Sequence, residues 1–155
     1  MKITVVGSGG WGTALAILLH NNGHQVTVWS YAQSEVDYIR EHHENALLKG
    51  VTVPEEIQLT TDISAVENAD FVVSAVPSFA VRSTAKAMAP YLTKDSIIVS
   101  VTKGIERDTS NRMSQIIEEV TDAKVAVLSG PTHAEEVGRG IPTGCVVACE
   151  DHAVV

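Results

Sequence analysis

The chain has 155 residues, of which 45% are hydrophobic and 19% charged, and its formal net charge is −8 at pH 7. This composition predicts a globular protein with a substantial core, and the acidic balance argues against nucleic acid or an anionic membrane as a partner. The apolar runs are far shorter than a membrane span, and the N-terminus has no signal-peptide pattern, so we expect a cytoplasmic protein without membrane insertion.

A short apolar strand over residues 3–6 leads into a glycine-rich turn and then a helix from about residue 12 to 22. Gly7, Gly9 and Gly12 have the spacing G-x-G-x-x-G, which is typical of dinucleotide-binding sites when it lies between a strand and a helix. Gly7 allows the tight turn, Gly9 lets a pyrophosphate approach the backbone, and Gly12 lets the helix pack closely on the strand. The alternative is an ordinary glycine-rich turn, which this strand–turn–helix context disfavours.

The second predicted strand, residues 26–29, ends where such folds bind the adenosine ribose. An Asp or Glu at this position would select NAD through the ribose 2′-hydroxyl. The residues here are Ser30, Tyr31 and Ala32, which include neither an acid nor an arginine. NADP is therefore permitted, and we expect a slight preference for NADPH. Tyr31 either stacks on the adenine or lies beside the phosphate, or it is simply a surface aromatic.

The next segment is mostly polar. We predict a helix from Ser34 to about residue 42, a solvated loop over residues 43–60, and a short helix over residues 61–70. Adjacent His42 and His43 do not indicate a metal site, because neighbouring histidines tend to point apart and no third ligand is evident.

A buried strand over residues 71–76 is followed directly by Pro77, which places a rigid turn at the carboxyl edge of the sheet. Ligands of open α/β folds bind at that edge. A helix over residues 79–91 and a strand over residues 97–101 come next, and this strand leads to Lys103. A flexible ammonium at such a strand end can neutralise a phosphate or polarise a carbonyl. The alternative is an ordinary surface lysine.

A second strand–glycine–helix pattern begins with the strand over residues 124–128. Gly130 permits close approach of a ligand, and the helix predicted to begin near Thr132 offers N–H donors and a hydroxyl. His133 is a candidate acid–base residue, although a histidine in a first helical turn often faces solvent.

The other predicted elements are a helix from residue 109 or 110 to about 120, a loop over 138–143, a last strand over 144–148 and the start of another helix at 150–152. The last strand carries Cys145, and Cys149 follows it. Residues four apart on a strand lie about 13 Å from each other, which is too far for a disulfide, so we predict two buried free thiols.

Strands and helices alternate along the chain, without an internal repeat or an interdomain linker. We therefore predict an α/β fold, a doubly wound, mainly parallel Rossmann-type sheet with helices on both faces. The loops at 7–12, 30–32, 77–79, 103 and 130–134 would form the ligand cleft.

These motifs resemble those of the NAD(P)-dependent glycerol-3-phosphate dehydrogenases of the bacterial biosynthetic type. The matching segments are GSGGWGTALA at 7–16, VPS at 76–78, TKGIE at 102–106, and SGPTHAEEV at 129–137 with GIPT at 140–143. They occur in the family's order and span nearly the whole chain. The first motif is shared by many dehydrogenases, whereas the last two together are specific.

The resemblance implies a reaction and a set of contact residues. The reaction is reversible hydride transfer between NAD(P)H and dihydroxyacetone phosphate, which gives glycerol 3-phosphate for phospholipid synthesis. The substrate contacts would be Lys103, Gly130 and Thr132. The cofactor contacts that it implies would be Gly10, Trp11, Tyr31, Lys103 and Ala134. The motif and turn described above add Gly7, Gly9, Gly12 and Pro77.

Members of that family are about twice as long and carry a second, helical domain that supplies the proton-transfer lysine. We therefore expect residues 1–155 to be the dinucleotide-binding domain, with no catalytic residue in this chain and the family's lysine beyond Val155. Alone, the chain should bind cofactor and turn over little or no substrate. A homo-oligomer is compatible with the sequence. The alternatives are a stand-alone nucleotide-sensing module and the N-terminal domain of another NAD(P)-dependent hydroxy-acid or sugar dehydrogenase.

Overall fold

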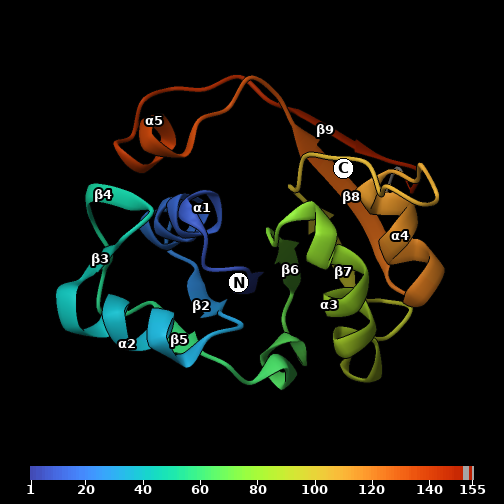
Figure 1. The fold of residues 1–155 in the computed structure, drawn as a ribbon, viewed down its shortest axis with the longest axis horizontal. Helices are drawn as coiled ribbons and strands as arrows, with labels where there is room; N and C mark the ends of the chain where they lie inside the picture. The colour runs from blue at the N-terminus through green and yellow to red at the C-terminus, as the bar shows by residue number, and fades with distance from the viewer. Residues whose placement is uncertain (152–153, 155) are drawn as a thin grey trace.

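The computed structural model describes residues 1–151 and 154. Within them, a seven-stranded sheet has the order β5-β2-β1-β6-β7-β8-β9, with a separate β3-β4 hairpin beside it (Figure 1). The strands of the sheet are β1 Lys2–Val6, β2 Gln25–Trp29, β5 Gln58–Thr60, β6 Phe71–Ser74, β7 Ile97–Ser100, β8 Lys124–Ser129 and β9 Val146–Cys149. All neighbouring pairs are parallel except β8 with β9. The predicted doubly wound, mainly parallel sheet is confirmed.

Helices cover both faces of this sheet. They are α1 Gly10–Asn21, α2 Gln33–His42, α3 Val81–Met88, α4 Met113–Val120 and α5 Ala134–Gly138, with 3-10 turns η1 Ile63–Val66, η2 Ser78–Ala80 and η3 Ala89–Tyr91. Alternating side chains of β1 serve different faces: Ile3 and Val5 pack in the core under α1, whereas Val6 packs in the core under α3 and α4. The buried face of α3 repeats at helical spacing from Val81 to Met88.

The strand order reverses direction between β1 and β6. From β1 the chain adds β2 and β5 on one side, and from β6 it adds β7, β8 and β9 on the other. In doubly wound folds the ligand crevice lies at such a switch point, beyond the carboxyl ends of the strands. This topology therefore predicts that a ligand binds at the loops that follow β1 and β6.

The predicted solvated loop over residues 43–60 is wrong. It contains β3 Glu44–Asn45, β4 Leu48–Thr52 and β5, and β5 extends the main sheet beside β2. Four apolar residues of this segment are 7% exposed or less, namely Leu48, Val51, Val53 and Ile57. Polar residues separate them in the sequence, so they form no apolar run.

Boundaries of other elements also differ from prediction. Helix α4 begins at Met113, because the expected cap Thr109 donates its hydroxyl to Glu106 and Ser110 has a φ of 60°. Helix α5 begins at Ala134, not near Thr132. Of the expected helix start at 150–152, residues 150 and 151 are described and are not helical, whereas residue 152 lies outside the described residues.

The two cysteines are free, as predicted, but they are not buried. Cys145 is exposed and Cys149 is partly exposed. Cys149 lies on β9, the antiparallel edge strand whose residues are mostly exposed, whereas Cys145 precedes β9, contrary to the predicted placement of the strand over residues 144–148.

The chain leaves the sheet at the end of β8, forms α5, and returns as β9. Figure 1 shows α5 beside α1, on the far side of the molecule from β8. Helix α5 also touches the hairpin, because a side-chain carbon at Gly138 would lie 3.3 Å from Leu48 and from Val51. Among the described residues, no helix is long and apolar enough to cross a membrane.

Candidate functional site

The glycine loop between β1 and α1 has the geometry that its three spaced glycines predict. Gly7 has a φ of 122°, and a side-chain carbon there would lie 2.7 Å from the backbone of Ala75 beyond β6. A carbon at Gly12 would lie 2.0 Å from the Gly7 carbonyl oxygen. Neither position therefore has room for a side chain, and the close packing at both holds the loop at the β1–β6 switch point.

Gly9 behaves differently from the other two. A side-chain carbon at Gly9 would meet nothing within 4 Å, so this residue borders open space instead of a packed neighbour. It is the N-cap of α1, and its carbonyl accepts the Thr13 N–H at 2.9 Å. A helix N-terminus with an unobstructed backbone suits the approach of a pyrophosphate. The cradle therefore fits the group that the motif predicts.

Asn45 braces the glycine loop from the β3-β4 hairpin. Its side-chain Nδ2 donates to the Ser8 carbonyl at 2.7 Å and to the Thr13 hydroxyl at 2.6 Å, and its Oδ1 accepts the Leu47 N–H at 2.8 Å. The residue is 4% exposed. Sequence reasoning missed this role, because one asparagine in a polar stretch carries no signal of its distant partners.

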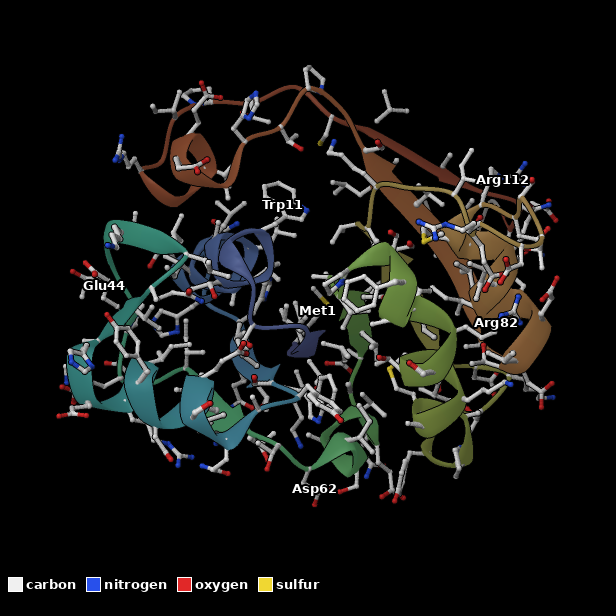
Figure 2. All side chains as sticks on the ribbon, in the orientation of Figure 1. Met1, Trp11, Glu44, Asp62, Arg82 and Arg112 are labelled. Carbon is white, nitrogen blue, oxygen red and sulfur yellow. The ribbon has the colours of Figure 1, made fainter. Side chains whose placement is uncertain are left out.

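Trp11 lies in the first turn of α1, on the side that faces the segment joining β8 to α5 (Figure 2). Its indole ring packs partly against the core, and its Nε1 is buried without a hydrogen-bond partner among the described residues. Buried indole N–H groups usually find a partner. An unpaired donor next to the glycine loop therefore suits a site that receives a polar ligand.

The loops after β6 and β7 are held together at the same edge. The Thr102 hydroxyl donates to the Val76 carbonyl at 2.7 Å. Gly104 has a φ of 143°, and a side-chain carbon there would lie 2.8 Å from Ser78. Pro77 is exposed between these contacts. The two predicted ligand loops thus form one continuous rim.

Lys103 and Gly130, predicted separately, are brought together. The Lys103 ammonium donates to the Gly130 carbonyl at 2.6 Å, although they lie 27 residues apart. The Thr132 N–H donates to the same carbonyl at 2.9 Å. The three predicted substrate contacts therefore meet around one main-chain oxygen, with a positive charge at the end of β7.

An ion-pair network fixes the loop that follows Lys103. Arg82 donates to both carboxylate oxygens of Glu106 at 2.7 Å and to Glu119 on α4 at 2.8 Å. Figure 2 shows Arg82 on the side of α3 that faces α4. The bonds from Arg82, then the Thr109 hydroxyl, lower the pKa of Glu106 to about 2. The network anchors this loop to two helices.

Three other predicted site residues lie on the rim: Tyr31 and His133, which make no side-chain hydrogen bond in the described region, and Ala134, which packs partly buried against the core. Tyr31 is 91% exposed directly after β2. Ala134 is the first residue of α5, and His133, its N-cap, is exposed and makes no side-chain capping bond. The structure does not connect His133 to Lys103 or Gly130 by any recorded hydrogen bond.

Two surface hollows, of about 550 and 530 Å³, lie away from this edge. The first is lined by α2 and residues 53–59, and the second lies at the amino ends of β1 and β2. Neither contains a predicted site residue. No group of three or more His, Cys, Asp or Glu residues in the described part of the chain could hold a metal ion.

Comparison with known proteins agrees with this geometry. Residues 2–155 match the family model described as the N-terminus of NAD-dependent glycerol-3-phosphate dehydrogenase. The chain is 49% identical to glycerol-3-phosphate dehydrogenase (NAD(P)+) of Fusobacterium nucleatum over 156 residues, which cover 97% of this chain and 47% of that protein. For the corresponding protein of Agathobacter rectalis, the identity is 48%, covering 94% and 44%.

The fold is similar to the crystal structure of glycerol-3-phosphate dehydrogenase from Coxiella burnetii. The TM-score is 0.91 at 29% identity, and the match covers 99% of this chain and 48% of that one. The chain thus spans about half the length of the curated relatives it matches. By sequence and by fold, it belongs to the NAD-dependent glycerol-3-phosphate dehydrogenase family, of which it represents the N-terminal part.

Proposed function

We propose that this chain binds NADH or NADPH along the carboxyl edge of its sheet, as the dinucleotide-binding domain of a glycerol-3-phosphate dehydrogenase. The observation that carries the proposal is the glycine loop at the β1–β6 switch point, with the open backbone at Gly9 and the packed backbones at Gly7 and Gly12. The names of the relatives, which specify NAD(P)+, support the same cofactor.

The cofactor would lie across the rim in an order set by the strands. Gly9, Gly10 and the N-terminus of α1 would hold the pyrophosphate, and Tyr31 after β2 would lie on the adenosine side. The unpaired Trp11 N–H, with Pro77 and Ala134, would border the remainder. When bound, the nicotinamide supplies or accepts the hydride.

The substrate would be dihydroxyacetone phosphate or glycerol 3-phosphate, held at Lys103, Gly130 and Thr132. The Lys103 ammonium would offset phosphate charge or polarise the carbonyl, and its bond to Gly130 already fixes its position. We propose no proton-transfer residue within this chain. The relatives are about twice as long, which supports a second domain as its source.

We also propose a metabolic role, a cellular location and a state of association for the protein. The product, glycerol 3-phosphate, would feed phospholipid synthesis, and the enzyme would work in the cytoplasm. Association into a homo-oligomer is compatible with the exposed apolar residues Val146 and Val147 on edge strand β9.

A titration tests the binding step directly. Saturable quenching of Trp fluorescence by NADH or NADPH is expected for the purified chain. Gly9→Val should fold, because nothing lies within 4 Å of the first carbon of the new side chain, but it should weaken binding at least tenfold by filling the cradle. Ala148→Val adds similar bulk on exposed β9 and should bind normally. Absence of binding by the unaltered chain, or normal binding by Gly9→Val, would contradict the proposal.

A further inference from the structure

A carboxylate lies at the corner between the glycine loop and the end of β2, although residues 30–32 include no acid. It belongs to Glu35, in the first turn of α2. Its Oε2 lies 2.5 Å from Ser8 Oγ and 2.5 Å from Ser30 Oγ. Residues 30–32 contain no acid, as the sequence shows, but α2 brings one back to this corner.

The hydrogen bonds give this carboxylate a fixed position. Ser30 Oγ accepts the Ala32 N–H at 3.3 Å and lies 2.8 Å from Ser8 Oγ, and both hydroxyls lie within hydrogen-bond distance of Glu35 Oε2, to which each can direct its one hydrogen. Ser8 and Ser30 are 7% and 1% exposed, whereas Glu35 is exposed. Two buried hydroxyls thus hold Oε2, and Oε1 has no recorded partner in the part of the chain that the structure describes. One carboxylate oxygen is available to a ligand.

This corner flanks the place where doubly wound sheets bind the adenosine ribose. Ser8 lies within the glycine loop after β1, and Ser30 directly follows β2, the parallel neighbour of β1. A carboxylate there accepts a hydrogen bond from a ribose 2′-hydroxyl and repels a 2′-phosphate. Among the described residues, no lysine or arginine is a recorded partner of this cluster that would offset the repulsion.

Building on the proposed function, we propose that Glu35 is a specificity-determining residue that makes the chain favour NADH over NADPH. The residue lies on a helix and not at the end of β2. Inspection of the strand-end position alone therefore does not find this acid. The preference is opposite to the one expected from Ser30, Tyr31 and Ala32 alone.

Separate fluorescence titrations with NADH and NADPH measure the two dissociation constants. We expect the unaltered chain to bind NADH more tightly. Glu35→Gln keeps the size of the side chain and removes its charge, so the ratio of the NADPH constant to the NADH constant should fall about tenfold, the factor for one hydrogen bond to a charged group. Glu41→Gln removes the same charge from an exposed site on α2 and should leave the ratio unchanged.

The outcomes separate this inference from the proposed function. Tighter binding of NADPH by the unaltered chain, or an unchanged ratio in Glu35→Gln, would overturn the role of Glu35 while nucleotide binding stands. Failure to bind either nucleotide would overturn both. If Glu35→Gln does not fold by circular dichroism, Ser30→Ala, which removes one of the two hydroxyls that hold the carboxylate, should lower the ratio in the same direction, and an unchanged ratio there would also overturn the role.

Discussion

Replacing Asn45 by alanine tests how the glycine loop is held from outside its own strand and helix. The change removes three hydrogen bonds, two donated to Ser8 and Thr13 and one accepted from Leu47. At 4% exposure of Asn45, water has little access to the groups left behind. The loop should therefore lose both its brace and part of its stability.

The expected loss of stability follows from the hydrogen-bonding groups that Asn45→Ala leaves unpaired. A protein hydrogen bond contributes about 1 kcal/mol net, and a buried group left unpaired costs about 1–3 kcal/mol. The Thr13 hydroxyl, already 3.4 Å from the Ser8 carbonyl, can compensate in part. We expect Asn45→Ala to lower the free energy of unfolding by about 2–4 kcal/mol, a large effect for a single substitution.

Urea unfolding followed by circular dichroism measures this loss, with a shift of the midpoint by about 1–2 M for a typical dependence on denaturant. Asn21→Ala, at the exposed end of α1, is the matched control and should change stability by less than about 0.5 kcal/mol. NADH affinity should also fall in Asn45→Ala. A loss below about 0.5 kcal/mol in that variant would refute the bracing role.

Three further substitutions probe other parts of the rim. Because Arg82 lowers the folded-state pKa of Glu106 to about 2, this carboxylate stabilises the fold above its ordinary pKa of 4.5 and loses that effect as the pH falls toward 2. Glu106→Gln should therefore flatten the decline of the melting temperature between pH 4.5 and pH 2. An unchanged slope in this variant would contradict the pairing of Glu106 with Arg82. Gly12→Ala should destabilise the chain far more than Gly9→Ala, because the carbon added at residue 12 would lie 2.0 Å from the Gly7 carbonyl oxygen. Equal melting temperatures of the two variants would refute the close packing at Gly12. Exposed Lys103→Met should shift the melting temperature little but abolish dihydroxyacetone phosphate reduction in an enzyme carrying this domain, and retained activity would exclude the proposed role.

The sequence predicted features that depend on neighbouring residues. The glycine spacing identified the loop after β1, and continuous apolar runs identified the central parallel strands, because residues buried on both faces form such runs. Lys103 and Gly130 were recognised from their places at strand ends. Their direct bond follows from the adjacent positions of β7 and β8 in the sheet.

Features that depend on distant contacts were not predictable in the same way. Asn45 and Glu35 reach Ser8 across 37 and 27 residues, and nothing in their immediate sequence indicates that partner. Strand β5 was missed because its place is set by pairing with β2, not by an apolar run of its own. The partial exposure of Cys149 follows from β9 lying at the sheet edge, which the sequence alone did not reveal.

The excursion from β8 through α5 to β9 gives the molecule regions of unequal local stability. Helix α5 has only five residues, too few to be stable on its own, so its position depends on packing against α1 and the hairpin. Such a segment can detach in a sub-global opening at a lower free-energy cost than separation of the central strands. Such an opening would release the link from β8 to α5, which carries Thr132, while the glycine loop and the sheet beneath it stay folded.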